Sequence, residues 1–206
     1  MENRLRQMDQ RKAEKMATVG RVAATLFNQK GYLETSMDDI SVAAQLSKGG
    51  IYHYFSSKHE ILYFIATSYM DLLLKELEQE LRKMDDPLSK MKFIVFRHID
   101  AYTRYTSEAK TTLHESHLLP PEFSKIYLRK EKKYYRIVLD VLSEIVGQPI
   151  SKSQLRVITF MLFGMCNWIY HWYKPKGYVN PAELSEIITC IFSRGIIGYR
   201  GSKMND

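Results

Sequence analysis

The sequence predicts an all-α fold of about nine helices. Apolar residues recur at helical spacing through most of the chain after residue 60, as at Ile61, Ile65 and Tyr69. One side of the helix expected over 88–105 is formed by Met91, Ile94, Val95, His98, Ile99 and Tyr102. No segment keeps the alternation of apolar and polar residues that indicates a half-buried strand. Glycine, which disfavours helix interiors, is sparse at 10 of 206 residues. We therefore expect three helices in an N-terminal head and six in a C-terminal body, the first of which is a long linking helix over 57–83.

Capping residues predict the first of two short helices between residues 35 and 60. Thr35 and Ser36 supply side-chain oxygens that can accept from the free N–H groups of a first helical turn. Asp38 and Asp39 follow in that turn, where the helix dipole favours negative charge. A turn at residues 45–46 then separates this helix from the next.

The second short helix is predicted to begin at the N-cap Ser47. Ile51 and Phe55, four residues apart, should face inward and leave basic and aromatic side chains facing outward. Gly49 and Gly50 each cost roughly 1 kcal/mol relative to alanine in a helix. The missing side chains would let the backbone approach a phosphate or a base edge closely.

Two short capped helices joined by a tight turn predict a helix-turn-helix, which places its second helix in the major groove of DNA. The plainer alternative is an ordinary amphipathic connector in a helical protein. The residues that we expect to contact DNA are Thr35, Ser36, Ser47, Lys48, Gly49, Gly50, Tyr52, His53 and Lys58.

The segment 37–62 closely resembles the DNA-binding domain of the TetR family of bacterial transcriptional regulators, and 22–32 is similar to the end of that family's first helix. The resemblance implies a homodimeric repressor that binds a palindromic operator and is released by a small molecule. It also implies a DNA-binding domain over 1–56 and an effector-binding and dimerisation domain over 57–206. Gly50 stands where most members carry a side chain that reaches a base, which shifts sequence readout towards Lys48 and DNA shape.

The charge balance suits a polyanionic partner, since the formal net charge is +7. Residues 1–58 hold nine Lys/Arg against six Asp/Glu, a net of +3. The resemblance implies that the basic N-terminal segment lies near the DNA backbone, and the alternative is a solvated tail. Its cations are Arg4, Arg6, Arg11, Lys12, Lys15 and Arg21.

The cysteine content and the hydropathy pattern predict a soluble cytoplasmic protein. The two cysteines indicate no disulfide framework, and the N-terminus lacks the apolar stretch of a signal peptide. The most apolar run, 158–172, is shorter than the ~20 residues of a membrane span.

The predicted helices over 151–173 and 181–198 carry apolar residues on more than one face, and such helices have to be covered on all sides. The resemblance implies that they form a four-helix bundle with a second subunit; the alternative is that they form the core of a monomer. The interface candidates are Leu155, Ile158, Leu162, Met165, Ile169, Trp172, Leu184, Ile188, Ile191 and Phe192.

The body is rich in aromatic and histidine side chains, as in ligand sites that are mostly apolar with a few placed polar groups. For any single aromatic residue, core packing is the alternative. The effector-site candidates are Phe96, His98, Tyr102, His114, His117, Tyr127, Phe163, Asn167 and Trp168.

The run 163–177 is similar to the C-terminal domain of a TetR subset that regulates the degradation of fatty acids, steroids or other acyl-CoA compounds. This weaker resemblance implies a fatty acyl-CoA or related CoA thioester as effector. Its phosphates would need cations, for which the alternative is a solvated surface charge. The candidates are Arg97, Arg104, Lys110, Lys125 and Arg129.

The sequence offers little sign of an enzyme or of a metal site. It shows no Gly-rich phosphate loop, nucleophile elbow or paired-carboxylate motif. His114 and His117 can share one helix face, but no third or fourth ligand is apparent, so we expect no metal and no cofactor. The alternative functions are an all-α enzyme or small-molecule-binding protein that does not bind DNA, and a DNA-binding architectural protein that has no effector.

Overall fold

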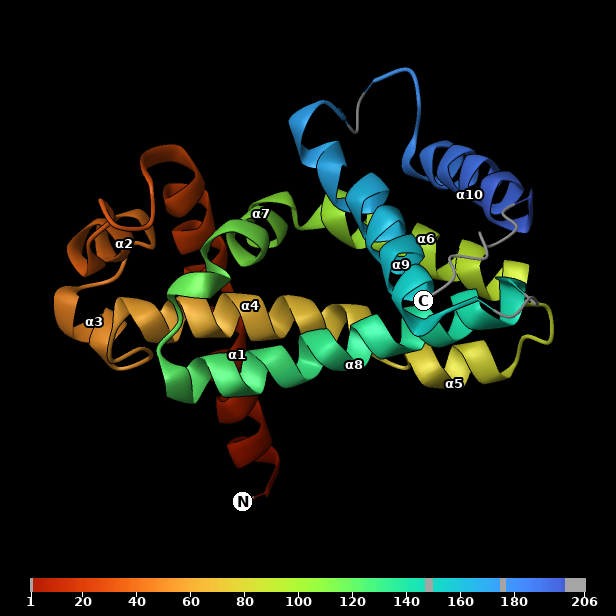
Figure 1. Ribbon diagram of the computed structural model, residues 1–206. Coiled ribbons are helices and arrows are strands. Elements are labelled where there is room, and N and C mark those ends of the chain that lie inside the picture. The colour runs from red at the N-terminus through yellow and green to blue at the C-terminus, as the bar shows by residue number, and fades with distance from the viewer. Residues whose placement is uncertain (1, 147–149, 175–176, 199–206) are drawn as a thin grey trace. The chain divides into compact units, whose positions relative to one another are not determined.

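All regular structure in the described part of the chain is helical, which confirms the predicted fold class (Figure 1). The computed structural model describes residues 2–146, 150–174 and 177–198. Its helices are α1 (Glu2–Lys30), α2 (Met37–Ala43), α3 (Lys48–Tyr52), α4 (Lys58–Leu74), α5 (Leu77–Arg82), α6 (Pro87–Arg104), α7 (Thr106–Glu115), the 3₁₀ helix η1 (Ser116–Leu118), α8 (Pro121–Val146), α9 (Lys152–Asn167), the 3₁₀ helix η2 (Trp168–His171) and α10 (Pro181–Gly198).

The chain forms two compact units. Unit 1 comprises Met1–Asp71 and Tyr105–Arg129, and unit 2 comprises Leu72–Arg104 and Lys130–Asp206, so the division falls within α4 and within α8. The predicted domain boundary at residue 57 marks the end of the helix-turn-helix motif and not the limit of a compact unit. It stays a prediction.

Unit 1 is built around α1, which packs on α2 and α7. Gly20 lets α1 approach α4 closely, because a Cβ there would lie 3.1 Å from the ring of Phe64. The Asn28 amide donates to the Ser107 carbonyl at 2.9 Å and to the Thr111 hydroxyl at 3.1 Å, which fixes α1 against α7. Gly31, with φ of 92°, ends α1. The apolar core that anchors the short helices is made by Ala23, Ala24, Phe27, Ile40, Ile51, Phe55, Ile61 and Leu62.

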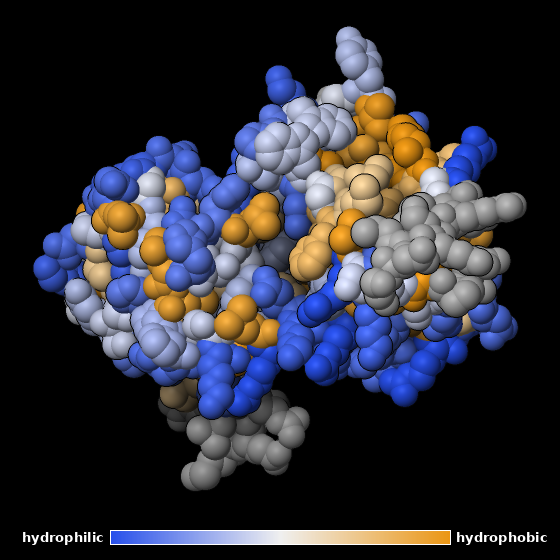
Figure 2. Space-filling view, in the orientation of Figure 1, coloured by the Kyte–Doolittle hydropathy of each residue, from blue (hydrophilic) through white to orange (hydrophobic). Residues whose placement is uncertain are grey.

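Unit 2 has α6 at its centre, packed on α10 and α9. Met91, Ile94, Val95 and Ile99 of α6 are buried, which is the face that the sequence predicts. On the surface, Figure 2 shows apolar residues gathered over α9 and α10. The residues that expose large apolar side chains there are Val157, Phe160, Met161, Trp168, Trp172, Ile187 and Ile191.

The predicted continuous helix over 57–83 is wrong, because the structure breaks it between α4 and α5. Glu76 adopts a left-handed backbone conformation, with φ of 58°. The carbonyls of Leu72, Leu73 and Lys75 bond to the Arg97 guanidinium. The apolar spacing carries no signal for this break, because Leu77 and Leu81 are buried as they would be in one long helix.

The helix that the sequence predicts over 151–173 also ends early. α9 stops at Asn167 and continues as the 3₁₀ helix η2 over Trp168–His171. Pro175 and Lys176, which belong to the motif over 163–177, lie outside the described residues.

Candidate DNA-binding surface and effector site

The start of α2 is fixed by a reciprocal cap. The Ser36 hydroxyl accepts from the Asp39 N–H at 3.0 Å, and the Asp39 carboxylate accepts from the Ser36 N–H at 2.8 Å. Lys30 adds an ion pair at 2.9 Å. Hydrogen bonds from Ser36, and then the Lys30 contact, hold the pKa of Asp39 well below its usual range. The cap is therefore intact across the physiological pH range.

Helix α3 begins at Ser47, whose hydroxyl accepts from the Gly50 N–H at 3.0 Å. A Cβ on Gly50 would lie 3.1 Å from that hydroxyl, whereas a Cβ on Gly49 would meet nothing within 4 Å. Gly50 therefore has a local reason, the space needed by the cap. Gly49 leaves bare backbone on the exposed side of α3, as the prediction of a close approach requires.

The outward face of α3 carries Lys48, Tyr52 and His53, while Ile51 is fully buried. Tyr52 is 47% exposed. The Lys48 ammonium forms an ion pair with Asp38 of α2 at 3.0 Å, and this contact raises the pKa of Lys48. The pair is highly exposed, so solvent weakens it and an operator phosphate can compete for the ammonium.

Lys58 occupies a different position from the one that the sequence suggests. Its ammonium donates to the carbonyls of Tyr32 at 2.6 Å, Leu33 at 3.1 Å and Thr35 at 2.8 Å, and lies 4.5 Å from the Tyr32 ring centroid. Burial lowers the pKa of Lys58. An ammonium has three N–H donors, and all three are used here. Lys58 therefore holds the turn between α1 and α2 against the start of α4.

Thr35 is also turned inward. It is 1% exposed, and its hydroxyl donates to the Gly31 carbonyl at 2.7 Å. Of the nine predicted DNA contacts, the structure leaves seven on or beside the surface of α2 and α3, and it gives Thr35 and Lys58 internal partners. Sequence spacing cannot show this, because the partners are backbone carbonyls of a turn 23 to 26 residues away from Lys58.

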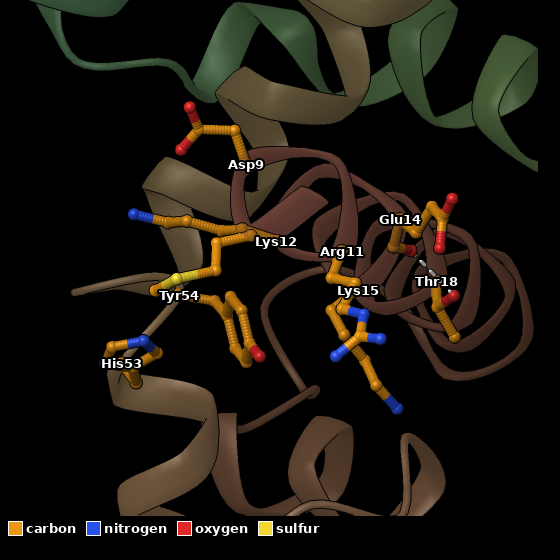
Figure 3. A pocket seen from close by; sticks show the side chains of 9 residues that line it. Asp9, Arg11, Lys12, Glu14, Lys15, Thr18, His53 and Tyr54 are labelled. Atoms are coloured by element: carbon orange, nitrogen blue, oxygen red, sulfur yellow. Dashed lines mark hydrogen bonds between the residues drawn. The ribbon is translucent and has the colours of Figure 1, made fainter. Parts of the chain in front are cut away.

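An open groove of about 600 Å³ adjoins the end of α3 (Figure 3). His53 and Tyr54 line one side, and α1 lines the other through Arg11, Lys12 and Lys15. These three cations are exposed and form no ion pair within the described part of the chain. The other lining residues are Met8, Asp9, Glu14 and Thr18. The side chains of Arg4 and Arg6 lie outside the described residues.

In unit 2, a buried histidine joins three helices. His98 Nε2 lies 3.0 Å from Asn167 Oδ1, and His98 Nδ1 lies 3.1 Å from the Tyr134 hydroxyl. Because an amide oxygen only accepts, Nε2–H donates to Asn167 and Nδ1 accepts from Tyr134. Burial lowers the pKa of His98 to about 4, although the Asn167 hydrogen bond opposes the shift. His98 is therefore neutral at physiological pH.

Because Asn167 accepts from His98 through its oxygen, its amide N–H groups stay available as donors. Asn167 forms no hydrogen bond through its amide N–H groups within the described residues, and it is only partly buried. Phe163 supplies an aromatic wall, with its ring 6.3 Å from His98 and 5.8 Å from Tyr134. Tyr134 is a partner that the sequence prediction missed, since contacts between helices far apart in sequence leave no spacing signal.

The nine effector candidates are divided between the two units. His98, Tyr102, Phe163 and Asn167 lie in unit 2, where burial raises the pKa of Tyr102 to about 12. Phe96 and Trp168 are exposed in the same unit. His114, His117 and Tyr127 belong to unit 1. Among the described residues, no group of three His, Cys, Asp or Glu side chains gathers to hold a metal ion.

The dimer candidates all lie in unit 2 and differ in burial. Five of them, Ile158, Leu162, Ile169, Leu184 and Ile188, are at most 9% exposed and form the core of unit 2. Leu155, Met165 and Phe192 are partly buried, whereas Trp172 and Ile191 are exposed. The exposed apolar face lies mostly one position away along each helix, at Val157, Phe160, Met161, Trp168 and Ile187.

Comparison with known proteins identifies the class. Residues 21–63 match the model of bacterial regulatory proteins of the tetR family, and residues 84–196 match that of the tetracyclin repressor-like C-terminal domain. The chain belongs to the TetR family, and it is a DNA-binding transcriptional regulator rather than an enzyme. This confirms the family resemblance seen in residues 37–62.

Individual relatives span nearly the whole chain. The HTH-type transcriptional repressor KstR2 of Mycolicibacterium smegmatis is 25% identical over 186 residues, which is 88% of this chain and 90% of that protein. A TetR-family regulator from Bordetella parapertussis 12822 is 31% identical, with a TM-score of 0.82 over 86% of this chain and 93% of that one. AibR, solved with isovaleryl coenzyme A and operator DNA, is 25% identical, with a TM-score of 0.74 over 86% of this chain and 97% of that one.

None of the helices in the described ranges combines the length and the apolar character that a membrane crossing requires.

The buried His98 predicts a pH-dependent stability. Unfolded His98 takes up a proton near pH 6.5, whereas folded His98 does so only near pH 4. Its contribution to the free energy of unfolding is therefore complete above pH 6.5 and is lost between pH 6.5 and 4, by up to about 1.4 kcal/mol per pH unit. Urea unfolding at pH 7, 6 and 5 should show that His98→Gln loses this dependence. Exposed His114→Gln should retain it, and identical pH profiles for wild type and His98→Gln would contradict a neutral buried histidine.

Proposed function

We propose that this protein is a repressor that binds a two-fold symmetric operator as a homodimer and dissociates from it when it binds a CoA thioester. The observation that carries the DNA-binding part is the outward face of α3, where Lys48, Gly49, Tyr52 and His53 are accessible beside a fixed cap. Groove contacts come from the Lys48 side chain and from the backbone at Gly49, which no side chain covers. The Gly50 backbone also approaches the groove closely. Ser47, Tyr52 and His53 contact phosphates. Ser36 does not, because its N–H and its hydroxyl both donate to the Asp39 carboxylate.

The cations on α1 supply a large part of the charge that neutralises the operator backbone. Lys58 has no N–H left for a phosphate, and Lys48 has to exchange Asp38 for one. Arg11, Lys12 and Lys15 have no such partners, and they line a groove with His53 and Tyr54. This favours the DNA-bound arm over the solvated tail.

The dimer forms through the exposed apolar face of α9 and α10. Phe160 and Met161 are each more than 60% exposed, and Ile191 is 61% exposed. An exposed patch of this composition marks an interaction surface. Gly164 and Gly195 open space beside it, since a Cβ on either would meet nothing within 4 Å. A two-fold dimer matches the symmetry of a palindromic operator.

The effector site lies around Asn167 and Phe163 of unit 2. The available Asn167 N–H groups suit a neutral hydrogen-bond acceptor, such as a thioester carbonyl, beside the Phe163 ring. A CoA thioester is supported by the similarity to AibR, which was solved with isovaleryl coenzyme A. Arg97 is unavailable for the CoA phosphates, because its guanidinium is bonded to backbone carbonyls.

Salt dependence tests the assignment of phosphate contacts. Each of Arg11→Gln, Lys12→Gln and Lys15→Gln should reduce the slope of log K against log salt by about 0.9, the loss expected for one phosphate contact. Operator duplexes selected from a random library and fluorescence anisotropy at several salt concentrations give the slope. Lys132→Gln removes an exposed cation from α8 and should leave it unchanged. Lys58→Met should lower thermal stability instead, and wild-type slopes in all three α1 variants would refute the proposal.

Introducing charge into the apolar face tests the dimer. Met161→Glu should give a monomer at micromolar concentration by analytical ultracentrifugation, because two carboxylates would be buried against apolar surface. Leu128→Glu is the matched control, since Leu128 is 50% exposed on α8. A Met161→Glu protein that stays dimeric would place the interface elsewhere.

Ligand comparison tests the effector class. Isovaleryl-CoA should bind by native mass spectrometry and weaken operator binding by roughly tenfold, a usual size for coupling between two sites. Coenzyme A and isovaleric acid separate the contribution of each half of the molecule. Asn167→Leu should bind isovaleryl-CoA less tightly by native mass spectrometry. Operator binding that is unaffected by isovaleryl-CoA would reject this effector and leave the DNA-binding assignment intact.

A further inference from the structure

Two consecutive residues of α6 hold different parts of unit 2. The Arg97 side chain reaches the end of α4, and the His98 side chain reaches α8 and α9. Neighbouring residues of a helix point about 100° apart, so one turn of α6 can contact both. Neither contact is visible in the sequence, where the motif over 163–177 and the linking helix lie far apart.

Arg97 completes the C-terminal end of α4. Its Nε donates to the Leu73 carbonyl at 2.9 Å, and its Nη2 donates to the carbonyls of Leu72 at 2.8 Å and of Lys75. The last carbonyls of a helix have no partner within the helix and form its negative end. A guanidinium is the one side chain whose planar fork can bridge several of them while carrying the matching charge. Arg97 therefore replaces the hydrogen bonds that a continued helix would have supplied.

The His98 bonds fix the same turn of α6 on its other side. The donation runs from the Tyr134 hydroxyl to Nδ1 and from Nε2–H to Asn167 Oδ1. Since the neutral ring has one donor and one acceptor, both positions are filled. A ligand acceptor that bonds the Asn167 N–H groups and rotates the amide removes Asn167 Oδ1 as the partner of the buried His98 Nε2–H. An unpaired buried N–H is costly in free energy, which favours a shift of α6 that gives Nε2–H a new partner.

We infer that Arg97 is a positioning residue that couples the His98 cluster to the end of α4. A displacement of α6 that starts at Asn167 and His98 moves the guanidinium, and with it the carbonyls of Leu72, Leu73 and Lys75. Those carbonyls end the helix whose first residue, Lys58, holds the turn before α2 through three hydrogen bonds. The inference rests on the proposed ligand response. It adds the residues that transmit the response from the effector site to α4.

The matched variants are Arg97→Met and Arg104→Met. Both remove an arginine from α6, but within the described residues Arg104 bonds only Asp100, one turn away on its own helix. Arg97→Met should increase hydrogen exchange in peptides covering 70–80 and weaken ligand-free operator binding by roughly tenfold. Arg104→Met should change neither. Arg97→Lys keeps the charge but lacks the planar fork of the guanidinium, and it should behave like Arg97→Met in both assays. It replaces Arg97→Met in the test if that variant does not fold.

Variants of the His98 cluster test the coupling itself. His98→Gln and Asn167→Leu alter the cluster without touching Arg97, and each should also raise exchange over 70–80. Arg97→Met should in addition respond less to isovaleryl-CoA than the wild-type protein. The inference is overturned if Arg97→Met only lowers the melting temperature, with operator affinity equal to that of Arg104→Met, or if the cluster variants leave exchange over 70–80 unchanged. A wild-type protein that ignores isovaleryl-CoA rejects the effector alone, because operator affinity and exchange in the ligand-free protein still decide the role of Arg97.

Discussion

The backbone groups that helix ends leave without partners organise this protein. Every helix exposes N–H groups at its start and carbonyls at its end, and a chain of many short helices has to satisfy them repeatedly. Serine hydroxyls do so at the start of α2, α3 and α9. Cations do so at two carbonyl clusters, Lys58 at the turn after α1 and Arg97 at the end of α4. The position of α3 depends on the caps of α2 and α3 and on the Lys58 contacts, because α3 is too short to be stable without them.

The basic residues of the chain therefore do three different things. Lys58 and Arg97 are bonded to the backbone and maintain the fold. Lys48 is paired with Asp38 in a pair exposed enough for DNA to compete with it. Arg11, Lys12 and Lys15 form no ion pair in the described chain, and we propose that they contact the operator backbone. Net charge alone gives all of these the same weight.

The structure and the sequence agree best where a feature is local. The caps at Ser36 and Ser47 and the buried faces of α3 and α6 follow from residues within one or two turns, and the sequence predicts them. The sequence is less informative for α9 and α10, where apolar residues occupy more than one face of each helix. Periodicity there shows that both helices are covered. It does not show that Ile158 and Leu162 pack within the subunit while Phe160 and Met161 stay exposed.

The sequence by itself determined the all-helical fold, the helix-turn-helix and the family, because these follow from caps, spacing and a specific local motif. Only the tertiary structure decided that Lys58 and Thr35 face inward, that α4 ends at Leu74, and that His98 is buried between Tyr134 and Asn167. Lys58, the end of α4 and His98 share one physical reason, because each depends on a polar group meeting a partner at least 22 residues away. The burial of Thr35 depends on how the turn after α1 packs.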